Sequence, residues 1–138
     1  MSDFNIYYEA AKAITGGKQV YGVAFSPGSG YYKYSPFTAL LFYFISILPY
    51  YPACIVFFFL LSVTTLFTSI LLLHIFSSYI FGRPVKSPNF ILSLAALCII
   101  IHLIRELGLG NVNMILLLLL SLSLLFIIQK RIVLSALF

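Results

Sequence analysis

Charge is what this chain has least of. Only 8% of its 138 residues are charged, whereas 62% are hydrophobic. A soluble domain usually has about a quarter of its residues charged. The shortage excludes an ordinary soluble globular protein, and the long apolar runs are typical of helices in lipid. We therefore predict an all-α, polytopic membrane protein.

Acidic side chains are scarcer than basic ones. Three acids, Asp3, Glu9 and Glu106, face eight lysines and arginines, and the formal net charge is +5. The basic residues are scattered or lie at the ends of apolar runs, where they set membrane orientation rather than bind a nucleic acid. We expect no nucleic-acid partner.

Residues for metal or redox chemistry are also few. Cys54 and Cys98 both lie within apolar runs, lack metal-site or redox spacing, and are expected to pack as small hydrophobic groups. Paired carboxylates, a glycine-rich phosphate loop and a nucleophile elbow are not found. We predict no cofactor and no metal. No signal peptide precedes Asp3, so we expect the later spans to drive insertion.

Residues 1–52 are predicted to form an external loop with one or two interfacial helices. In residues 3–15, apolar side chains recur at helical spacing, with Ser2 or Asp3 as the N-cap and Gly16-Gly17 as the stop. The tyrosines on that apolar face suit a membrane interface. Pro36 is placed to begin a second helix over residues 37–49. That helix would reach about 18 to 20 Å, short of the roughly 30 Å hydrocarbon core.

Residues 53–138 are predicted to be the transmembrane region, with three spans at about 53–80, 89–104 and 112–128. The 81–88 loop and the C-terminal end carry Arg83, Lys86, Lys130 and Arg131 without acids nearby. By the positive-inside rule these parts are cytoplasmic, although three lysines in the N-terminal region oppose this. We predict a multi-pass protein of the cytoplasmic (inner) membrane with its N-terminal region outside.

Asp3 is the acid with the most suggestive setting, since it opens an interfacial helix with aromatic neighbours. The simpler interpretation is a helix cap. The functional one is a general base, because a carboxylate at a membrane surface can accept a proton from a bound hydroxyl.

A series of short motifs resembles the GT-C type polytopic glycosyltransferases. The chain is most similar to family 87, the polyprenyl-phosphate-mannose-dependent mannosyltransferases, and the resemblance runs in order along nearly the whole chain. The matching residues are Asp3, Tyr7, Tyr8, Ala10, Ala11, Gly16 or Gly17, Tyr21, Tyr34, Pro36, Leu48, Pro49, Gly110 and Asn113. Asn111 departs from the family, which usually has glutamine there. The family also has eight or more spans, so we interpret this chain as a fragment of a larger enzyme.

The resemblance implies a function at the outer membrane face. Asp3 would be the general base, and a hexose, with mannose as the expected sugar, would pass from a polyprenyl-phosphate donor to a glycolipid or glycan acceptor. Membrane lipids would be its other partners. Tyr7, Tyr8 and Tyr34 would stack on sugar rings or donate hydrogen bonds, although each could instead belong to an interfacial aromatic belt.

Three residues near residue 110 are further candidates for substrate binding. Arg105 could bind the lipid phosphate, since a guanidinium matches phosphate oxygens, or it could pair with Glu106 or a lipid headgroup. Asn111 and Asn113 could fix the loop beside the active site or cap the third span.

Two other classes of function stay open. A non-enzymatic small membrane protein, such as an assembly subunit or an inactive remnant, would fit a chain with so few spans. A transporter or channel component is less favoured, because the spans contain almost no ionisable residue.

Overall fold

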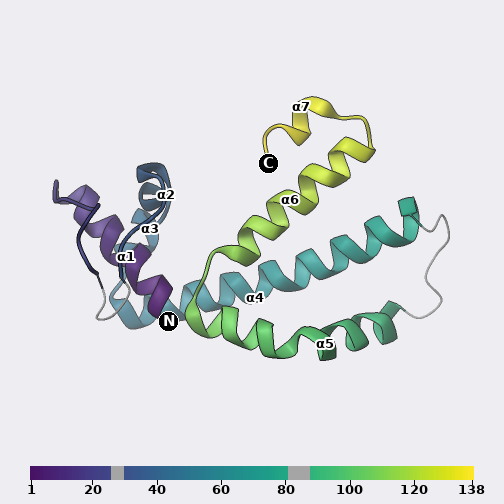
Figure 1. Cartoon of the computed structure of the whole chain (residues 1–138), viewed down its shortest axis with the longest axis horizontal. Coiled ribbons are helices and arrows are strands. Elements are labelled where there is room, and N and C mark those ends of the chain that lie inside the picture. Colours follow the sequence, from purple (N-terminus) through teal and green to yellow (C-terminus); the bar gives the residue numbers. More distant parts are fainter. Residues whose placement is uncertain (26–29, 81–87) are drawn as a thin grey trace. The chain divides into compact units, whose positions relative to one another are not determined.

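The computed structural model describes residues 1–25, 30–80 and 88–138, and the regular structure of these residues is helical (Figure 1). An isolated antiparallel bridge joins Ala24 and Tyr31. The elements are α1 (Ser2–Thr15), α2 (Pro36–Leu41), α3 (Tyr43–Ser46), α4 (Tyr50–Ile75) with a π-helical turn (Phe76–Ile80), α5 (Pro88–Leu109), α6 (Asn113–Ile128) and α7 (Ile132–Ser135).

The described residues form two compact units. The first unit contains Met1–Leu60 and Leu107–Asn111, and the second contains Leu61–Glu106 and Val112–Phe138. Helix α4 contributes its first turns to one unit and the rest to the other. The candidate site described below lies entirely within the first unit.

Helix α1 follows the predicted periodicity. Phe4, Tyr7, Tyr8 and Ala11 are all buried, and the helix ends at Thr15 before the two glycines, as expected. The predicted N-cap is wrong, because Ser2 and Asp3 lie inside the first turn and Met1 is the N-cap. The Met1 carbonyl accepts a hydrogen bond from the Asn5 N–H at 3.2 Å, which extends the helix by one residue.

The short helix predicted over residues 37–49 is two helices. As expected, the first begins at Pro36, where the Ser35 hydroxyl accepts a hydrogen bond from the Phe37 N–H at 3.1 Å. The chain then breaks at Phe42, whose ring is buried against Phe4, Tyr7 and Phe57, and α3 follows as a separate turn. Both short helices lie beside α1 (Figure 1).

The core of the first unit is an aromatic cluster. The Phe4 ring stacks on Phe57 of α4 with centroids 4.7 Å apart, and Tyr7 stacks on Phe42 at 5.0 Å. Tyr8 and Tyr50 meet edge to face at 5.4 Å. Such ring pairs add roughly 0.5–1.5 kcal/mol each beyond the burial of their area. The cluster therefore fixes α1 against α3 and the start of α4.

Helix α5 runs further than the predicted span of 89–104. Residues 105–109, which lie between two of the predicted spans, continue the helix, since Arg, Glu and Leu are good helix formers. The helix ends before Gly110, whose φ of +70° is a left-handed conformation typical of helix C-termini. The start of α4 also differs from the expected residue 53, because Pro52 is accommodated in its first turn.

Three membrane spans were predicted, and the described residues support fewer. The continuous segment Tyr50–Tyr79, with 30 residues and a mean hydropathy of 2.4, is long and apolar enough to cross a bilayer. A second crossing arises only if Ile100–Leu109 and Asn113–Ile128, bent by 116° at their junction, act together. Helix α6 has 16 residues, fewer than the roughly 20 a span needs. The polytopic count is thus not confirmed.

Part of the orientation argument falls outside the described residues. Arg83 and Lys86, which the positive-inside prediction uses, lie in the segment 81–87, and part of the predicted N-terminal loop lies in 26–29.

Candidate functional site

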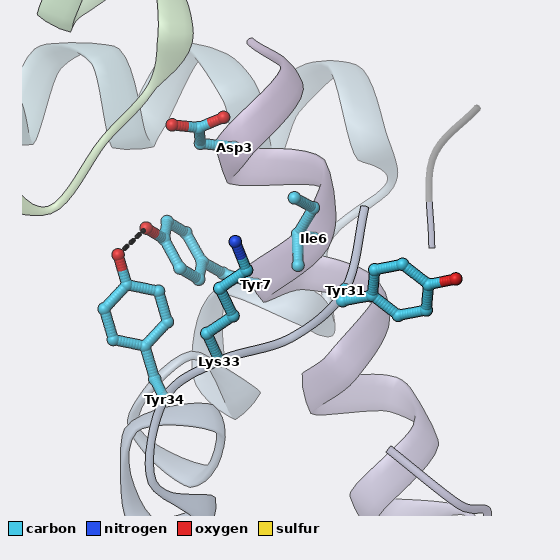
Figure 2. A pocket seen from close by; sticks show the side chains of 6 residues that line it. All are labelled: Asp3, Ile6, Tyr7, Tyr31, Lys33 and Tyr34. Carbon is cyan, nitrogen blue, oxygen red and sulfur yellow. Dashed lines mark hydrogen bonds between the residues drawn. The ribbon is translucent and has the colours of Figure 1, made fainter. Parts of the chain in front are cut away.

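A cavity of about 230 Å³ opens in the first unit. Asp3, Ile6 and Tyr7 line it from α1, and Tyr31, Lys33 and Tyr34 line it from the segment before α2 (Figure 2). Two stretches about 25 residues apart in sequence therefore meet here. One carboxylate, one ammonium group and three phenol rings surround a space open to a ligand.

The helical repeat explains the α1 side of the cavity. Asp3, Ile6 and Tyr7 are spaced i, i+3 and i+4, and side chains with that spacing share a face. Asp3 stands in the first turn, where the positive end of the helix dipole favours a carboxylate. Its Oδ1 accepts a hydrogen bond from the Ser2 hydroxyl at 3.3 Å.

Backbone and side-chain hydrogen bonds hold the other wall against α1. The Phe25 N–H donates to the Gly30 carbonyl at 2.7 Å, next to the Ala24–Tyr31 bridge. The Asn5 side-chain amide of α1 donates to the Phe25 carbonyl at 3.2 Å. These contacts join the loop that leads into residue 31 to the helix that carries Asp3.

Tyr32 is buried in the segment that forms the same wall. Its hydroxyl donates to the Ser35 carbonyl at 2.7 Å. Desolvation by burial, and then the nearby Tyr21, raise the pKa of the Tyr32 phenol above its ordinary value. Tyr32 therefore stays neutral and remains a hydrogen-bond donor at physiological pH.

A hydroxyl network crosses the cavity. The Tyr7 hydroxyl lies 3.1 Å from the Tyr34 hydroxyl and 3.5 Å from Asn111 Oδ1 (Figure 2 shows the first contact). When Tyr7 donates to Tyr34, Tyr34 keeps its own proton and can donate it to a ligand. The structure thus brings together four predicted site residues: Asp3, Tyr7, Tyr34 and Asn111.

Gly110 makes the approach of Asn111 possible. A Cβ atom at Gly110 would lie 2.8 Å from the Phe4 Cβ and 3.3 Å from the Met1 Cβ, so only a glycine fits without a shift. The sequence associated this glycine with the family pattern. The structure adds a packing role, because the turn carrying Asn111 rests directly on the first residues of α1.

The other three predicted site residues lie elsewhere. Tyr8 is not among the described residues that line the cavity: it is buried, its hydroxyl donates to the Leu48 carbonyl at 2.7 Å, and the Lys12 ammonium lies 4.1 Å from its ring centroid. Arg105 is exposed in the second unit. Asn113, also in the second unit, donates through its amide to Glu106 Oε2 at 3.0 Å.

Lys33 and Ile6 line the cavity although the sequence did not indicate them as site residues. Lys33 is one of the three N-terminal lysines that oppose the predicted membrane orientation. The signal that could have identified it is the spacing of Tyr31 and Lys33, because alternate residues of an extended segment point to the same side. Ile6 lies three residues after Asp3, on the same helical face.

The groups that line the cavity suit a ligand with several hydroxyl groups. A carboxylate accepts hydrogen bonds, an ammonium group donates three, and phenols do both. Within the part of the chain that the structure describes, no three His, Cys, Asp or Glu side chains gather as they would around a metal ion. The cavity's polar groups therefore point to a sugar or a phosphate rather than to an apolar ligand.

Comparisons with known proteins give one match. The model of a family described as glycosyltransferase family 87 matches residues 32–138. No curated protein and no solved structure matches the chain. The matched region includes Lys33, Tyr34 and Asn111 of the cavity region and begins after Asp3 and Tyr7.

Proposed function

Because the chain belongs to glycosyltransferase family 87, we propose that it transfers a hexose, specifically mannose, from a polyprenyl-phosphate donor to a glycan or glycolipid acceptor. The reaction takes place at the outer face of the cytoplasmic membrane, and Asp3 is its general base. The family makes the chain a membrane glycosyltransferase. The sugar, the donor, the acceptor and the sidedness are our proposal.

The observation that carries the proposal is the composition of one cavity. Asp3 shares it with Tyr7 and Tyr34, and Asn111 contacts the Tyr7 hydroxyl. An exposed apolar surface adjoins the site within the same unit: Phe37, Leu41 and Phe44 of α2 and α3 are 66%, 58% and 74% exposed. Side chains this apolar suit the interface of a bilayer, where a lipid-linked donor resides.

The chemistry needs one base. The Asp3 carboxylate takes the proton of the acceptor hydroxyl as that oxygen forms a bond to the anomeric carbon. The bond between the anomeric carbon and the phosphate oxygen breaks, and the polyprenyl phosphate leaves with the electron pair. A single displacement of this kind inverts the configuration at the anomeric carbon.

Other residues orient the substrates. Tyr34 donates a hydrogen bond to the sugar, and Tyr7 holds the Tyr34 hydroxyl in position by donating to it. Tyr8 has a packing role, since its hydroxyl is already bonded to the Leu48 carbonyl. For Arg105 and Asn113 a substrate role stays a prediction, and among the described contacts Asn113 pairs with Glu106.

Asp3→Asn tests the proposal. The purified chain in liposomes is given mannosyl-phosphoryl-polyprenol and a glycolipid acceptor, and transfer of labelled mannose is measured. Removal of a general base typically costs about 10²- to 10⁴-fold in rate, and the amide keeps the shape of the carboxylate. Glu9→Gln, an acid on the same helix outside the cavity lining, is the matched control and should retain transfer.

Circular dichroism of each variant checks that the helices persist. Transfer by Asp3→Asn at the wild-type rate would remove Asp3 from the mechanism. Absence of transfer by the wild-type chain with mannosyl, glucosyl and galactosyl donors alike would favour the non-enzymatic alternative.

A further inference from the structure

We propose that Lys33 binds the phosphate of the lipid-linked donor, in the cavity that it shares with Asp3; this inference rests on the proposed function. Lys33 is the cation among the six residues that line the cavity (Figure 2). Its side chain extends along the cavity, and its ammonium end points toward α1.

The two other lysines of the first unit occupy different surroundings. The Lys12 ammonium lies 4.1 Å from the centroid of the Tyr8 ring, in a cation–π contact. Lys18 is exposed just after α1. Lys33 is also exposed, but it is carried by a segment held beside α1, because the Tyr34 hydroxyl lies 3.1 Å from the hydroxyl of Tyr7 in that helix.

The opposite charges of Lys33 and Asp3 determine which substrate group each of them can bind. A phosphate oxygen is attracted to the Lys33 ammonium and repelled by the Asp3 carboxylate, whereas a neutral acceptor hydroxyl can donate directly to Asp3. We therefore expect the donor phosphate to contact the Lys33 ammonium and the acceptor hydroxyl to contact the Asp3 carboxylate. A single displacement requires this order, because the hydroxyl attacks the anomeric carbon opposite the bond to the phosphate.

The negative charge on the phosphate that Lys33 would bind increases as the reaction proceeds. The donor phosphate is a diester with one negative charge, and the leaving group is a monoester that gains a second as the bond breaks. An interaction that strengthens along the reaction raises kcat as well as affinity. Lys33 is thus expected to affect kcat and donor KM, and the salt dependence of both.

Binding of a simple probe tests this without relying on transfer. Decyl phosphate, inorganic phosphate and decanol are titrated calorimetrically into the full chain in detergent. Lys33→Gln should weaken decyl phosphate binding about 10- to 100-fold, the range for loss of a hydrogen bond to a charged group. Lys33→Arg should restore most of it, and Lys18→Gln, a charge removed outside the cavity lining, should leave it unchanged.

The three probes separate the possible ligands. Loss of decyl phosphate binding in Lys33→Gln, with decanol binding unaffected, supports recognition of a lipid phosphate. Equal Lys33-dependent binding of inorganic phosphate would show a general anion site and overturn the lipid-linked assignment. Unchanged decyl phosphate binding in Lys33→Gln would overturn the proposal outright.

A transfer assay distinguishes this inference from the proposed function. If Asp3→Asn abolishes transfer while Lys33→Gln leaves kcat and donor KM unchanged, the function stands and the Lys33 inference fails. If the wild-type chain transfers no sugar but its decyl phosphate affinity depends on Lys33, the inference stands as a binding site and the function fails.

Discussion

The aromatic cluster around Phe4 and helix α5 place phenylalanine side chains in opposite settings. Phe4 in the first unit is fully buried, with its ring against four other aromatic rings, whereas Phe90 in the second unit is 68% exposed. Leu97 and Ile101 of α5 are likewise more than two-thirds exposed. The Phe4 cluster supplies its own apolar environment, whereas the exposed side chains of α5, like Phe37 and Phe44 of the first unit, are of a kind that a bilayer would cover. The difference shows that apolar side chains of the same type can either pack inside the protein or face lipid.

The largest expected effect is the difference in stability between replacing the buried Phe4 and the exposed Phe90 with alanine. Phe4→Ala should lower the free energy of unfolding by about 3–5 kcal/mol, because it leaves a cavity within the aromatic cluster. Phe90→Ala should change it by less than about 0.5 kcal/mol, the usual range for an exposed position. Urea unfolding in detergent micelles, followed by tyrosine fluorescence, measures both. Equal effects of the two substitutions would refute a packed core in the first unit.

A smaller effect is expected at the glycines, where two positions share a backbone conformation. Gly110 and Gly17 have φ values of +70° and +67°, but a Cβ at Gly17 meets nothing within 4 Å. Alanine at either position should cost about 1–2 kcal/mol for the left-handed backbone. At Gly110 the contact with Phe4 should add about 1–3 kcal/mol of overpacking.

The same two glycines test whether packing at Gly110 affects sugar transfer. Gly110→Ala should also reduce sugar transfer, since it displaces Asn111 from Tyr7, while Gly17→Ala should not. Unfolding and transfer are compared for the two variants in parallel. Equal destabilisation by the two alanines would mean that the turn does not rest on α1.

The smallest expected effect concerns pH and Tyr32. Its pKa is raised above 10.0 in the fold, so the folded state favours the neutral phenol. This contribution to stability is complete below the unfolded pKa of 10.0 and is lost as pH rises through the folded value. The free energy of unfolding should fall less between pH 9 and pH 11 in Tyr32→Phe than in the wild type. Identical falls would contradict a desolvated Tyr32.

Several helices of the first unit could be predicted from local sequence patterns. The spacing of Phe4, Tyr7, Tyr8 and Ala11 predicted a helix and its buried face, and Pro36 marked the start of α2. These features depend on residues close in sequence, which is why a single sequence reveals them. The resemblance to family 87 is confirmed by the family match over residues 32–138.

The remainder depended on contacts between distant residues. The break at Phe42 arises because its ring packs on residues of α1 and α4, and no local signal indicates it. Helix α5 extends to Leu109, past the charged pair Arg105 and Glu106, whereas the predicted span ends at residue 104. Lys33 is a site candidate only because the fold brings its segment against α1, where Tyr34 contacts Tyr7 and the two segments line one cavity.

The contact of Tyr7 with Asn111 spans 104 positions of the chain. This contact can form only after the chain has been synthesised through residue 111, long after the residues of α1. The Tyr7 hydroxyl can therefore meet Tyr34, 27 positions away, before it can meet Asn111, so the two contacts can form in sequence during synthesis.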